Sequence, residues 1–230
     1  MIEKKIIALV PIRQVSTRLE NKNFRLLDGK PLYQHILDTL HSIDSIDQVI
    51  INTDSDIIKE ACSTRYSKVR IIDRPNSING PDITMNTLIN YDLSQVEGEH
   101  FFQTHATNPL LTSETIIDAI QHYFERLGTK DSLLSVYPLK KRLYQKNLEP
   151  INHQNGVLAQ TQDLPEVLVE NSNIFIFSRT SFFENHQSRI GSSPFAFYMN
   201  ELEGIDIDTG NDLALAELIC QNRTKSLREM

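Results

Sequence analysis

Residues 8–32 read ALVPIRQVSTRLENKNFRLLDGKPL, and this stretch decides how the rest of the chain is interpreted. It opens as an apolar run that we expect to form a buried strand, and the run breaks at Pro11. The loop that should follow carries five cations: Arg13, Arg18, Lys22, Arg25 and Lys30. The chain as a whole has a net charge of −7, so this concentration of positive charge needs a specific reason.

The composition of the 230-residue chain bounds its class. The length predicts a single domain, residues 1–230, and the acidic balance argues against nucleic acid or an anionic membrane as a partner. Cys62 and Cys220 lie far apart and outside any zinc-like or disulfide spacing, which favours a reduced, cytoplasmic protein. No apolar run approaches the ~20 residues of a membrane span.

Apolar runs alternate with helically periodic segments along most of the chain. We expect strands at 6–12, 48–53, 68–73, 100–105, 131–136, 173–178 and 205–208, and helices at 31–43, 55–62, 83–93, 113–127 and 210–222. This alternation predicts an α/β fold, a Rossmann-like, mostly parallel mixed sheet with helices on both faces. Ligands of such sheets bind outside the carboxyl ends of the strands, which directs attention to the loops at 13–30, 54–55, 74–82 and 104–111.

The stretch from 137 to 172 breaks this rhythm. It is polar, rich in turn residues and poorly periodic, and it is too long for an idle connection. We therefore expect an inserted arm or small dimerisation element within the single domain.

The cationic loop follows the first strand, which is a frequent place for phosphate binding. Neither GxGxxG nor GxxxxGK[ST] is present, so side chains must meet the anion. Arg13 and Arg18 offer planar donor forks, Lys22 offers a point charge, and Asn23 could bind a base or ribose edge. Ser16 and Thr17 add hydroxyl donors. The alternative is a solvated loop whose cations pair with Glu20 and Asp28.

A second pattern, GIDIDTGNDL at 204–213, alternates two isoleucines with two aspartates. On a strand this places Asp206 and Asp208 on one face, about 7 Å apart. Two carboxylates at a loop edge form a hard-oxygen site suited to Mg²⁺. The alternative is an edge strand with a solvated face, with an aspartate or threonine capping the helix that follows.

Both patterns resemble the cytidylyltransferases that activate acidic sugars, the acylneuraminate (CMP-sialic acid) synthetases. Their N-terminal signature reads roughly IPAR-x-x-S-x-x-x-x-x-KN-x-x-x-L-x-GKPL, and their C-terminal signature is close to [IV]-D-I-D-x-x-x-D-x-x-x-A-E. The positions that match are Arg13, Ser16, Lys22, Asn23, Gly29, Lys30, Pro31, Leu32, Asp206, Asp208, Asp212, Ala216 and Glu217. Gln14 and Val15 replace the usual glycines after the first arginine. The resemblance implies a nucleotidyltransferase fold in which Asp206 and Asp208 bind magnesium.

Three further segments resemble the same family less closely. RPNSINGPD, which begins at Arg74, is similar to its R-P-x-x-L-x-x-D segment, in which the arginine approaches cytosine; Asp82 matches as well. An ordinary ion pair of Arg74 with Asp73 or Asp82 is the alternative.

The segment FQTHATNPLL resembles the family's L-Q-P-T-S-P-L-R segment, with His105 in the place of glutamine, Asn108 in the place of serine and Thr107 matching. A purely structural His105 remains open.

The ENSNIFIF segment resembles the family's R-P-N-G-A-I-Y-I strand, and Asn171 matches. Glu170 stands where the arginine is expected, in a region that the resemblance assigns to the sugar carboxylate. Lys140, Lys141 and Arg142 in the arm could supply that charge, and we take Lys141 as the candidate. A solvated basic arm is the alternative.

The resemblance implies a Mg²⁺-dependent reaction of CTP with a nonulosonic, 2-keto sugar acid, giving a CMP-sugar and pyrophosphate, in a homodimer. Arg13, Lys22 and Asp208 would carry catalysis. The residues that would bind the nucleotide are Arg13, Ser16, Arg18, Lys22, Asn23, Arg74 and Asp82. The residues that would bind the sugar are His105, Thr107, Asn108, Lys141 and Asn171.

Rival interpretations are a CMP-Kdo-type or other sugar-acid transferase, a catalytically silent nucleotide-sugar sensor, and a receiver-like domain built on INTDSD. All but the last require the early cations and the late aspartates to face one cleft.

Overall fold

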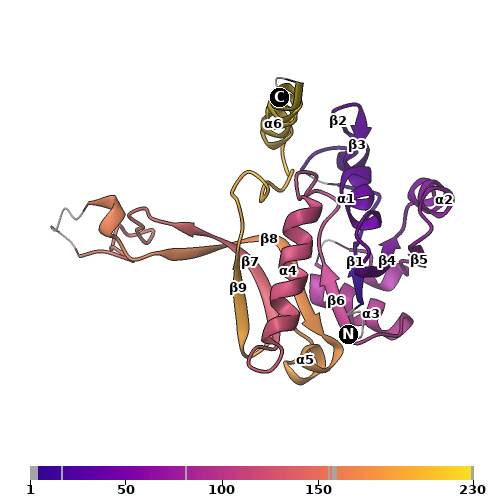
Figure 1. The fold of residues 1–230 in the computed structure, drawn as a ribbon, viewed down its shortest axis with the longest axis horizontal. Coiled ribbons are helices and arrows are strands. Elements are labelled where there is room, and N and C mark those ends of the chain that lie inside the picture. The colour runs from indigo at the N-terminus through magenta and orange to yellow at the C-terminus, as the bar shows by residue number, and fades with distance from the viewer. Residues whose placement is uncertain (1–4, 17, 81, 155, 157–159, 229–230) are drawn as a thin grey trace.

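A seven-stranded sheet forms the centre of the protein (Figure 1). The computed structural model describes residues 5–16, 18–80, 82–154, 156 and 160–228. In spatial order the strands are β5 (Val69–Asp73), β4 (Ile46–Thr53), β1 (Ile6–Leu9), β6 (His100–Gln103), β8 (Val167–Ser178), β7 (Ser132–Leu139) and β9 (Pro194–Tyr198). Of these strands, β8 alone runs antiparallel to its neighbours, so the other six end at one edge of the sheet.

Helices cover both faces of this sheet because strand side chains alternate between the faces. Ala8 and Ile51 pack into a core with α1 (Leu32–His41), α2 (Asp56–Arg65) and α4 (Ser113–Arg126). Leu9 and Ile50 pack on the opposite face with α3 (Met85–Gln95) and α5 (Arg179–Glu184). The predicted α/β architecture, a mostly parallel sheet with helices on both faces, is confirmed. None of the helices in the described part of the chain is both long enough and apolar enough to cross a membrane.

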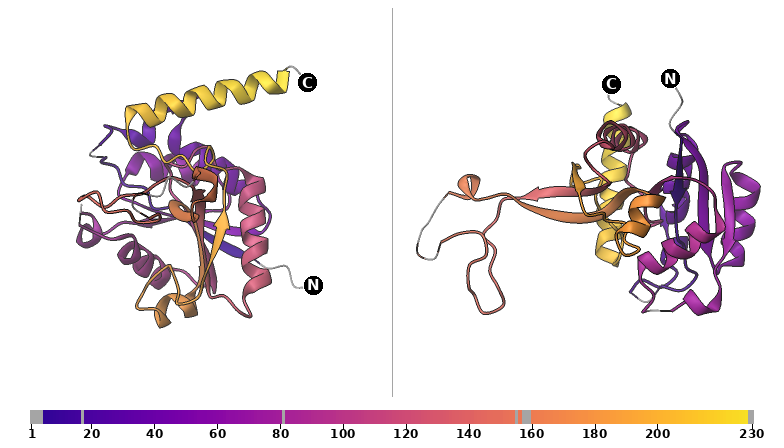
Figure 2. Two further views of the ribbon diagram at one scale, coloured as in Figure 1. Left: turned by 90° about the vertical axis from the view of Figure 1, so that its left-hand side faces the viewer. Right: turned by 90° about the horizontal axis from the view of Figure 1, so that it is seen from below.

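A small third core joins the beginning of the chain to its end. The hairpin of β2 (Leu26–Leu27) and β3 (Lys30–Pro31) turns through Asp28 and Gly29, both at positive φ, which is the geometry that an Asp-Gly hairpin turn requires. Leu27 packs with Ile207 and with Ala216 of α6 (Gly210–Arg228), the helix that lies along one end of the molecule in Figure 2. This apolar contact fixes the late segment beside the early loop.

Several predicted boundaries are corrected by the structure. The strand expected at 205–208 is wrong: this segment pairs with no strand among the described residues, and the Ile207 N–H instead donates to the Thr107 carbonyl at 2.9 Å. The loop at 13–30 contains a short 3-10 turn, Lys22–Phe24, as well as the β2–β3 hairpin. The sequence reasoning also missed α5 and β9.

The segment between β7 and β8 projects from the body as an arm (Figures 1 and 2). The two strands remain paired as far out as Leu139 and Val167, and the arm, residues 140–166, continues beyond them. It exposes large apolar side chains, among them Leu148 and Ile151, and carries a groove of about 630 Å³ between Ile151 and Val167.

Candidate active site

A cavity of about 350 Å³ lies at the carboxyl edge of the sheet. Its walls come from the loops after β1, β5 and β6, from the start of α3, and from the segment before α6. Most of the residues that the sequence proposed line this one cavity: Arg13, Ser16, Arg18, Lys22, Asn23, Arg74, His105, Thr107, Asp206 and Asp208. The structure thus brings the early cations and the late aspartates together.

The cationic loop is held in place by local contacts. Asn21 adopts a left-handed conformation with φ 53°, and the 3-10 turn starts directly after it. The buried Asn23 side chain donates from Nδ2 to the Arg13 carbonyl at 2.9 Å, which ties the two ends of the loop together. Lys22 is thereby directed inward, whereas the Arg13 guanidinium stays exposed at the rim. Thr17 lies outside the described residues.

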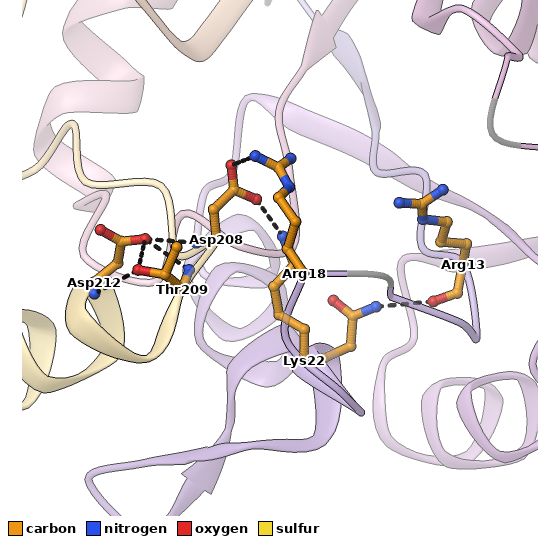
Figure 3. Close-up of polar contacts among 7 residues, drawn as sticks. Arg13, Arg18, Lys22, Asp208, Thr209 and Asp212 are labelled. Atoms are coloured by element: carbon orange, nitrogen blue, oxygen red, sulfur yellow. Dashed lines mark hydrogen bonds and ion pairs between the residues drawn. The ribbon is translucent and has the colours of Figure 1, made fainter.

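The Asp208 carboxylate is the meeting point of the site (Figure 3). It accepts from Lys22 Nζ at 2.8 Å and pairs with Arg18 Nη1 at 2.5 Å, while Arg13 lies apart from this cluster. Lys22 has a side chain that is 16% exposed, so its ion pair is better shielded from solvent than that of Arg18, at 67%. Neither cation pairs with Glu20 or Asp28, so the solvated-loop alternative does not describe the structure.

Lys30, from the same loop, belongs to a different cluster. Its ammonium pairs with Asp38 of α1 at 2.5 Å, and Asp38 also accepts from the Tyr66 hydroxyl at 2.6 Å. This pair anchors the hairpin to α1 outside the cavity.

The segment that carries the aspartates is fixed on both sides. Ile207 is fully buried in the small core, and Asp212 accepts through Oδ2 from the backbone N–H groups of Asp208 and Thr209. Thr209 Oγ1 in turn accepts from the Asp212 N–H at 3.3 Å, so these two residues form a reciprocal cap at the start of α6 and Asp212 holds the Asp208 backbone in position. The side chains of Asp206 and Asp208 both reach the cavity although no strand presents them.

Asp206 carries an unusual carboxyl group. Burial raises its pKa above the ordinary value, and the neighbouring Asp208 adds to that shift, while Thr107, Lys22 and Arg18 oppose it. Its Oδ1 atom is buried and has no hydrogen-bond partner among the described residues. A buried carboxylate oxygen without a partner, beside a second carboxylate, fits a divalent cation.

The number of carboxylates in the cavity limits which metal ion the site can hold. In the described part of the chain no group of three or more His, Cys, Asp or Glu side chains could hold a metal ion. Mg²⁺ needs no such cage, because it retains waters and is commonly held by one or two carboxylates together with substrate phosphates. The donor set Asp206 and Asp208 therefore fits Mg²⁺ in the presence of a triphosphate.

Arg74 lines the cavity on the side away from the early loop, and a series of buried hydrogen bonds holds its side chain. Its Nε donates to Asn52 Oδ1 and its Nη2 donates to the Asn52 carbonyl, both at 2.8 Å, and Asn52 Nδ2 donates to Asp92 at 2.6 Å. Burial lowers the pKa of Arg74 and raises the pKa of Asp92 to about 7. The ion pair of Arg74 with Asp73 or Asp82 is not formed; Asp73 pairs with Lys59 instead.

His105 lines the cavity at the end of β6. Burial, followed by the positive charges of Arg189 and Lys22, lowers its pKa to about 4. The imidazole is thus neutral at physiological pH, where it can donate or accept one hydrogen bond but cannot serve as a cation for an anionic ligand.

Four predicted residues do not line the cavity. Asp82 is exposed, and Lys141 is exposed in the projecting arm. Asn108 is fully buried behind the wall, and neither its Oδ1 nor its Nδ2 has a hydrogen-bond partner among the described residues. Asn171 lies in an irregular stretch of β8, where it accepts from the Ser135 hydroxyl, so its side chain is engaged in shaping the strand.

The sequence reasoning missed two features of the site. Asn52 and Asp92 lie inside predicted elements, where only the fold reveals that they meet Arg74. Arg189 lies in the connection between α5 and β9, and its side chain reaches Gln103 at the end of β6. The one signal for Arg189 in the sequence was indirect: Glu170 occupies the place of an expected arginine, so the charge had to come from elsewhere.

Comparison with known proteins places the chain in a family. The family model described as cytidylyltransferase matches residues 7–229. The chain belongs to the cytidylyltransferase family. An N-acylneuraminate cytidylyltransferase of Streptococcus agalactiae is 25% identical over 219 residues, which cover 90% of this cytidylyltransferase-family chain and 51% of the relative. The chain thus spans about half the length of the first curated relatives that it matches.

Two further relatives match this chain over almost the full length of both sequences. A CMP-N,N'-diacetyllegionaminic acid synthase of Legionella pneumophila is 26% identical over 236 residues, covering 97% of this family member and 99% of the relative. A solved CMP:2-keto-3-deoxy-manno-octonic acid synthetase in complex with CTP superposes with a TM-score of 0.69 at 14% identity, over 95% and 99% of the two chains. At that identity the superposition establishes the shared nucleotidyltransferase fold.

Proposed function

We propose that this member of the cytidylyltransferase family transfers a cytidylyl group from CTP to a nonulosonic, sialic-type sugar acid and releases pyrophosphate. The observation that carries the proposal is the meeting of Lys22 and Arg18 with Asp208 in one cavity, with Asp206 beside them. This arrangement combines cations for a triphosphate with carboxylates for its metal, and such a combination suits phosphoryl and nucleotidyl transfer.

The nucleotide would enter along the early loop. The exposed Arg13 and Arg18, together with the shielded Lys22, would neutralise the triphosphate, and the Ser16 hydroxyl would donate to it. Arg74, held by two hydrogen bonds to Asn52, would face the base, and Asn23 would line the wall that the early loop forms. The anomeric hydroxyl of the sugar acid would then attack the α-phosphorus in line with the departing pyrophosphate.

Asp206 and Asp208 are the residues that would hold Mg²⁺. A magnesium ion bound there supplies positive charge that stabilises the oxygens of the reacting phosphate groups. The unpartnered Oδ1 of Asp206 supports this role, because ligation would satisfy an oxygen that otherwise lacks a partner. Asp208 would have to exchange at least one of its two cations for the metal, and the cation released would be free for the triphosphate.

The substrate side would be formed by His105, Thr107 and the adjoining wall. A neutral His105 suits a hydrogen bond to a sugar hydroxyl and does not suit proton transfer near neutral pH. Relatives named for acylneuraminate and for diacetyllegionaminic acid support a nonulosonic acid as the acceptor.

The replacement of the family's glycines has a visible consequence. The Gln14 backbone N–H donates to Asp54 Oδ1 at 2.6 Å, and Val15 is 68% exposed. The Gln14 amide is thus engaged, and the phosphate contacts fall to the side chains. This keeps the catalytically silent nucleotide-sugar sensor as the second candidate.

Pyrophosphate release separates the candidates. Wild-type protein is incubated with CTP, Mg²⁺ and one of several 2-keto sugar acids, including N-acetylneuraminic acid, diacetyllegionaminic acid and 2-keto-3-deoxy-manno-octonic acid. We expect turnover with a nine-carbon acid. Turnover with the octonic acid alone would move the proposal to the CMP-Kdo type, and CTP binding without turnover on any acid would favour the sensor.

We further propose that the arm mediates a homodimer. It projects from the body with exposed Leu148 and Ile151 beside an apolar groove, and such a surface gains from being covered. Sedimentation velocity of the wild type and of Leu148→Asp tests this. We expect the variant to dissociate, and a monomeric wild type would overturn the proposal.

A further inference from the structure

Arg189 lies next to the proposed active site and is fixed from three directions. Its backbone N–H donates to Asn86 Oδ1 of α3 at 3.2 Å. Its guanidinium lies 3.5 Å from the centre of the Phe175 ring of β8, and Nη1 donates to Gln103 Oε1 at the end of β6. Three different elements therefore determine where this positive charge sits.

The charge of Arg189 has no carboxylate partner in the described part of the chain. Among the described residues, the one side-chain acceptor for its five donors is the fully buried Gln103, and that acceptor is neutral. Burial lowers the pKa of Arg189 to about 10, which still leaves it charged at neutral pH. Placing a cation in such surroundings without an anion is costly, so the arrangement suits a ligand that brings the anion.

Other arginines of the protein show how a structural guanidinium is satisfied. Arg179, in the same region of the sequence, donates to three backbone carbonyls, those of Gly98, Leu93 and Val96, at 2.6–2.8 Å. Arg18 pairs with Asp208, and Arg74 makes two hydrogen bonds to Asn52. Among the described residues, Arg189 has neither a carboxylate nor a backbone carbonyl as an acceptor, whereas Arg179, Arg18 and Arg74 each have one or the other.

The position of Arg189 connects it to the cavity. Gln103 Nε2 lies 3.5 Å from His105 Nε2, and the charge of Arg189 acts directly on His105, whose pKa it helps to lower. His105 lines the cavity with Thr107 and the two aspartates, and Met85, next to Asn86, lines it from α3. Arg189 therefore lies close to His105 and to the start of α3, with its side chain partly exposed, and apart from the triphosphate cations, which gather around Asp208.

The two positions that the family resemblance assigns to a substrate carboxylate, 170 and 141, are badly suited to it in this chain. Position 170 carries a negative charge; Glu170 is exposed and accepts from the Ser172 hydroxyl at 3.2 Å. Lys141 lies in the arm, beyond the last pair of β7 and β8, and is exposed. An incoming carboxylate would be repelled by Glu170, whereas the planar guanidinium of Arg189 can donate hydrogen bonds to both of its oxygens.

We infer that Arg189 is the residue that binds the carboxylate of the sugar-acid substrate, in a subsite formed with Gln103 and His105. The inference rests on the proposed function and deepens it, since it explains how a chain with Glu170 can select an acid. Gln103 holds the guanidinium, and the neutral His105 can donate to the same ligand without competing for its charge.

The test compares Arg189→Met with a matched control. Arg126 also stacks its guanidinium on a ring, 4.2 Å from the centre of Phe195, but it lies on α4 and does not line the cavity, so Arg126→Met controls for loss of a stacked arginine. We expect Arg189→Met to raise the KM for the sugar acid about tenfold or more while the KM for CTP stays within about twofold, and Arg126→Met to change neither. Equal effects on both KM values would overturn the inference.

A substrate change identifies the group that is recognised. Wild type should discriminate strongly between the sugar acid and its carboxamide, and Arg189→Met should lose most of that discrimination, because it removes the cation that distinguishes the two. Arg189→Lys, which keeps the charge but not the fork, should fall between them and serves if the methionine variant fails to fold. A variant that discriminates as well as wild type would contradict the assignment.

Binding without turnover separates this inference from the proposed function. The carboxylate carbon of a 1-¹³C-labelled sugar acid is followed by NMR with wild type and Arg189→Met in the presence of CTP. A shift with wild type that the variant loses supports Arg189 even if no pyrophosphate appears, in which case the proposed activity fails alone. Equal binding by both proteins with normal turnover overturns the inference and leaves the activity standing, and absence of binding to wild type overturns both.

Discussion

On the side of the cavity built by the early loop, Lys22 and Arg18 form ion pairs with the Asp208 carboxylate. Beyond His105, the guanidinium of Arg189 instead donates a hydrogen bond to the amide oxygen of Gln103. Lys22 and Arg18 share one carboxylate in the free protein, and a ligand must exchange partners with Asp208. No carboxylate among the described residues pairs with Arg189, so an anion can bind there without displacing one. The comparison indicates that metal and nucleotide binding should be coupled through Asp208, while the acid subsite should act independently.

The largest effect on activity is expected from removing the Asp208 carboxylate. Asp208→Asn removes the partner of both cations and one of the two candidate metal ligands, so we expect the rate of pyrophosphate release to fall roughly a thousandfold or more with an unchanged fold. Circular dichroism and thermal unfolding check the fold. Asp73→Asn, an exposed carboxylate outside the cavity, is the control. Full activity of Asp208→Asn would remove the assignment of this site.

A second prediction separates two lysines of the same loop. Lys22→Ala should raise the KM for CTP roughly tenfold to a hundredfold, because a shielded, charge-assisted contact to the triphosphate is lost. Lys30→Ala should leave the KM for CTP unchanged and lower the free energy of unfolding by about 1 kcal/mol or less, since Lys30 pairs with Asp38 at a partly exposed site. Equal KM values for CTP in both variants would show that the cavity cluster does not bind the nucleotide.

A third prediction concerns Arg74, which, like Arg189, donates to a neutral side-chain amide. In this case the amide, that of Asn52, in turn donates to the buried Asp92. Burial raises the pKa of Asp92 from 3.8 to about 7, so the folded state binds this proton more tightly than the unfolded state. The resulting stabilisation is complete below the unfolded pKa and is lost as pH rises through about 7. Asp92→Asn removes this dependence.

Urea unfolding from pH 4 to pH 8 measures the difference. The free energy of unfolding of wild type should fall relative to Asp92→Asn as pH rises, by at most about 4 kcal/mol over the whole interval. A difference that stays constant with pH would mean that Asp92 is already ionised throughout.

The smallest effect is expected at Glu170. Its charge acts on Arg189 without forming an ion pair with it, and Glu170 is exposed, so solvent screens the interaction. Glu170→Gln should lower the KM for the sugar acid about twofold and leave the KM for CTP unchanged. A raised KM for the acid would mean that Glu170 contacts the substrate favourably.

Much of the fold could be predicted from the sequence because the signals are local. Alternating apolar runs and periodic segments identified β1, β4, β5, β6 and the helices α1 to α4, and position after the first strand directed attention to the cationic loop. The Asp28-Gly29 hairpin was missed although its turn signal is present. The short β9 and α5 were missed because few residues give too little periodicity.

The residue types and spacings by themselves determined the α/β class and the two chemical halves of the candidate site, the early cations and the late aspartates. Only the tertiary structure decided which charges meet. The small core of Leu27, Ile207 and Ala216 brings Asp208 to Lys22 across 186 positions of sequence, and the sheet edge brings Arg189 to Gln103. Apolar periodicity is fixed by neighbours a few residues away, whereas the partner of a charged side chain depends on contacts that form only when distant segments pack.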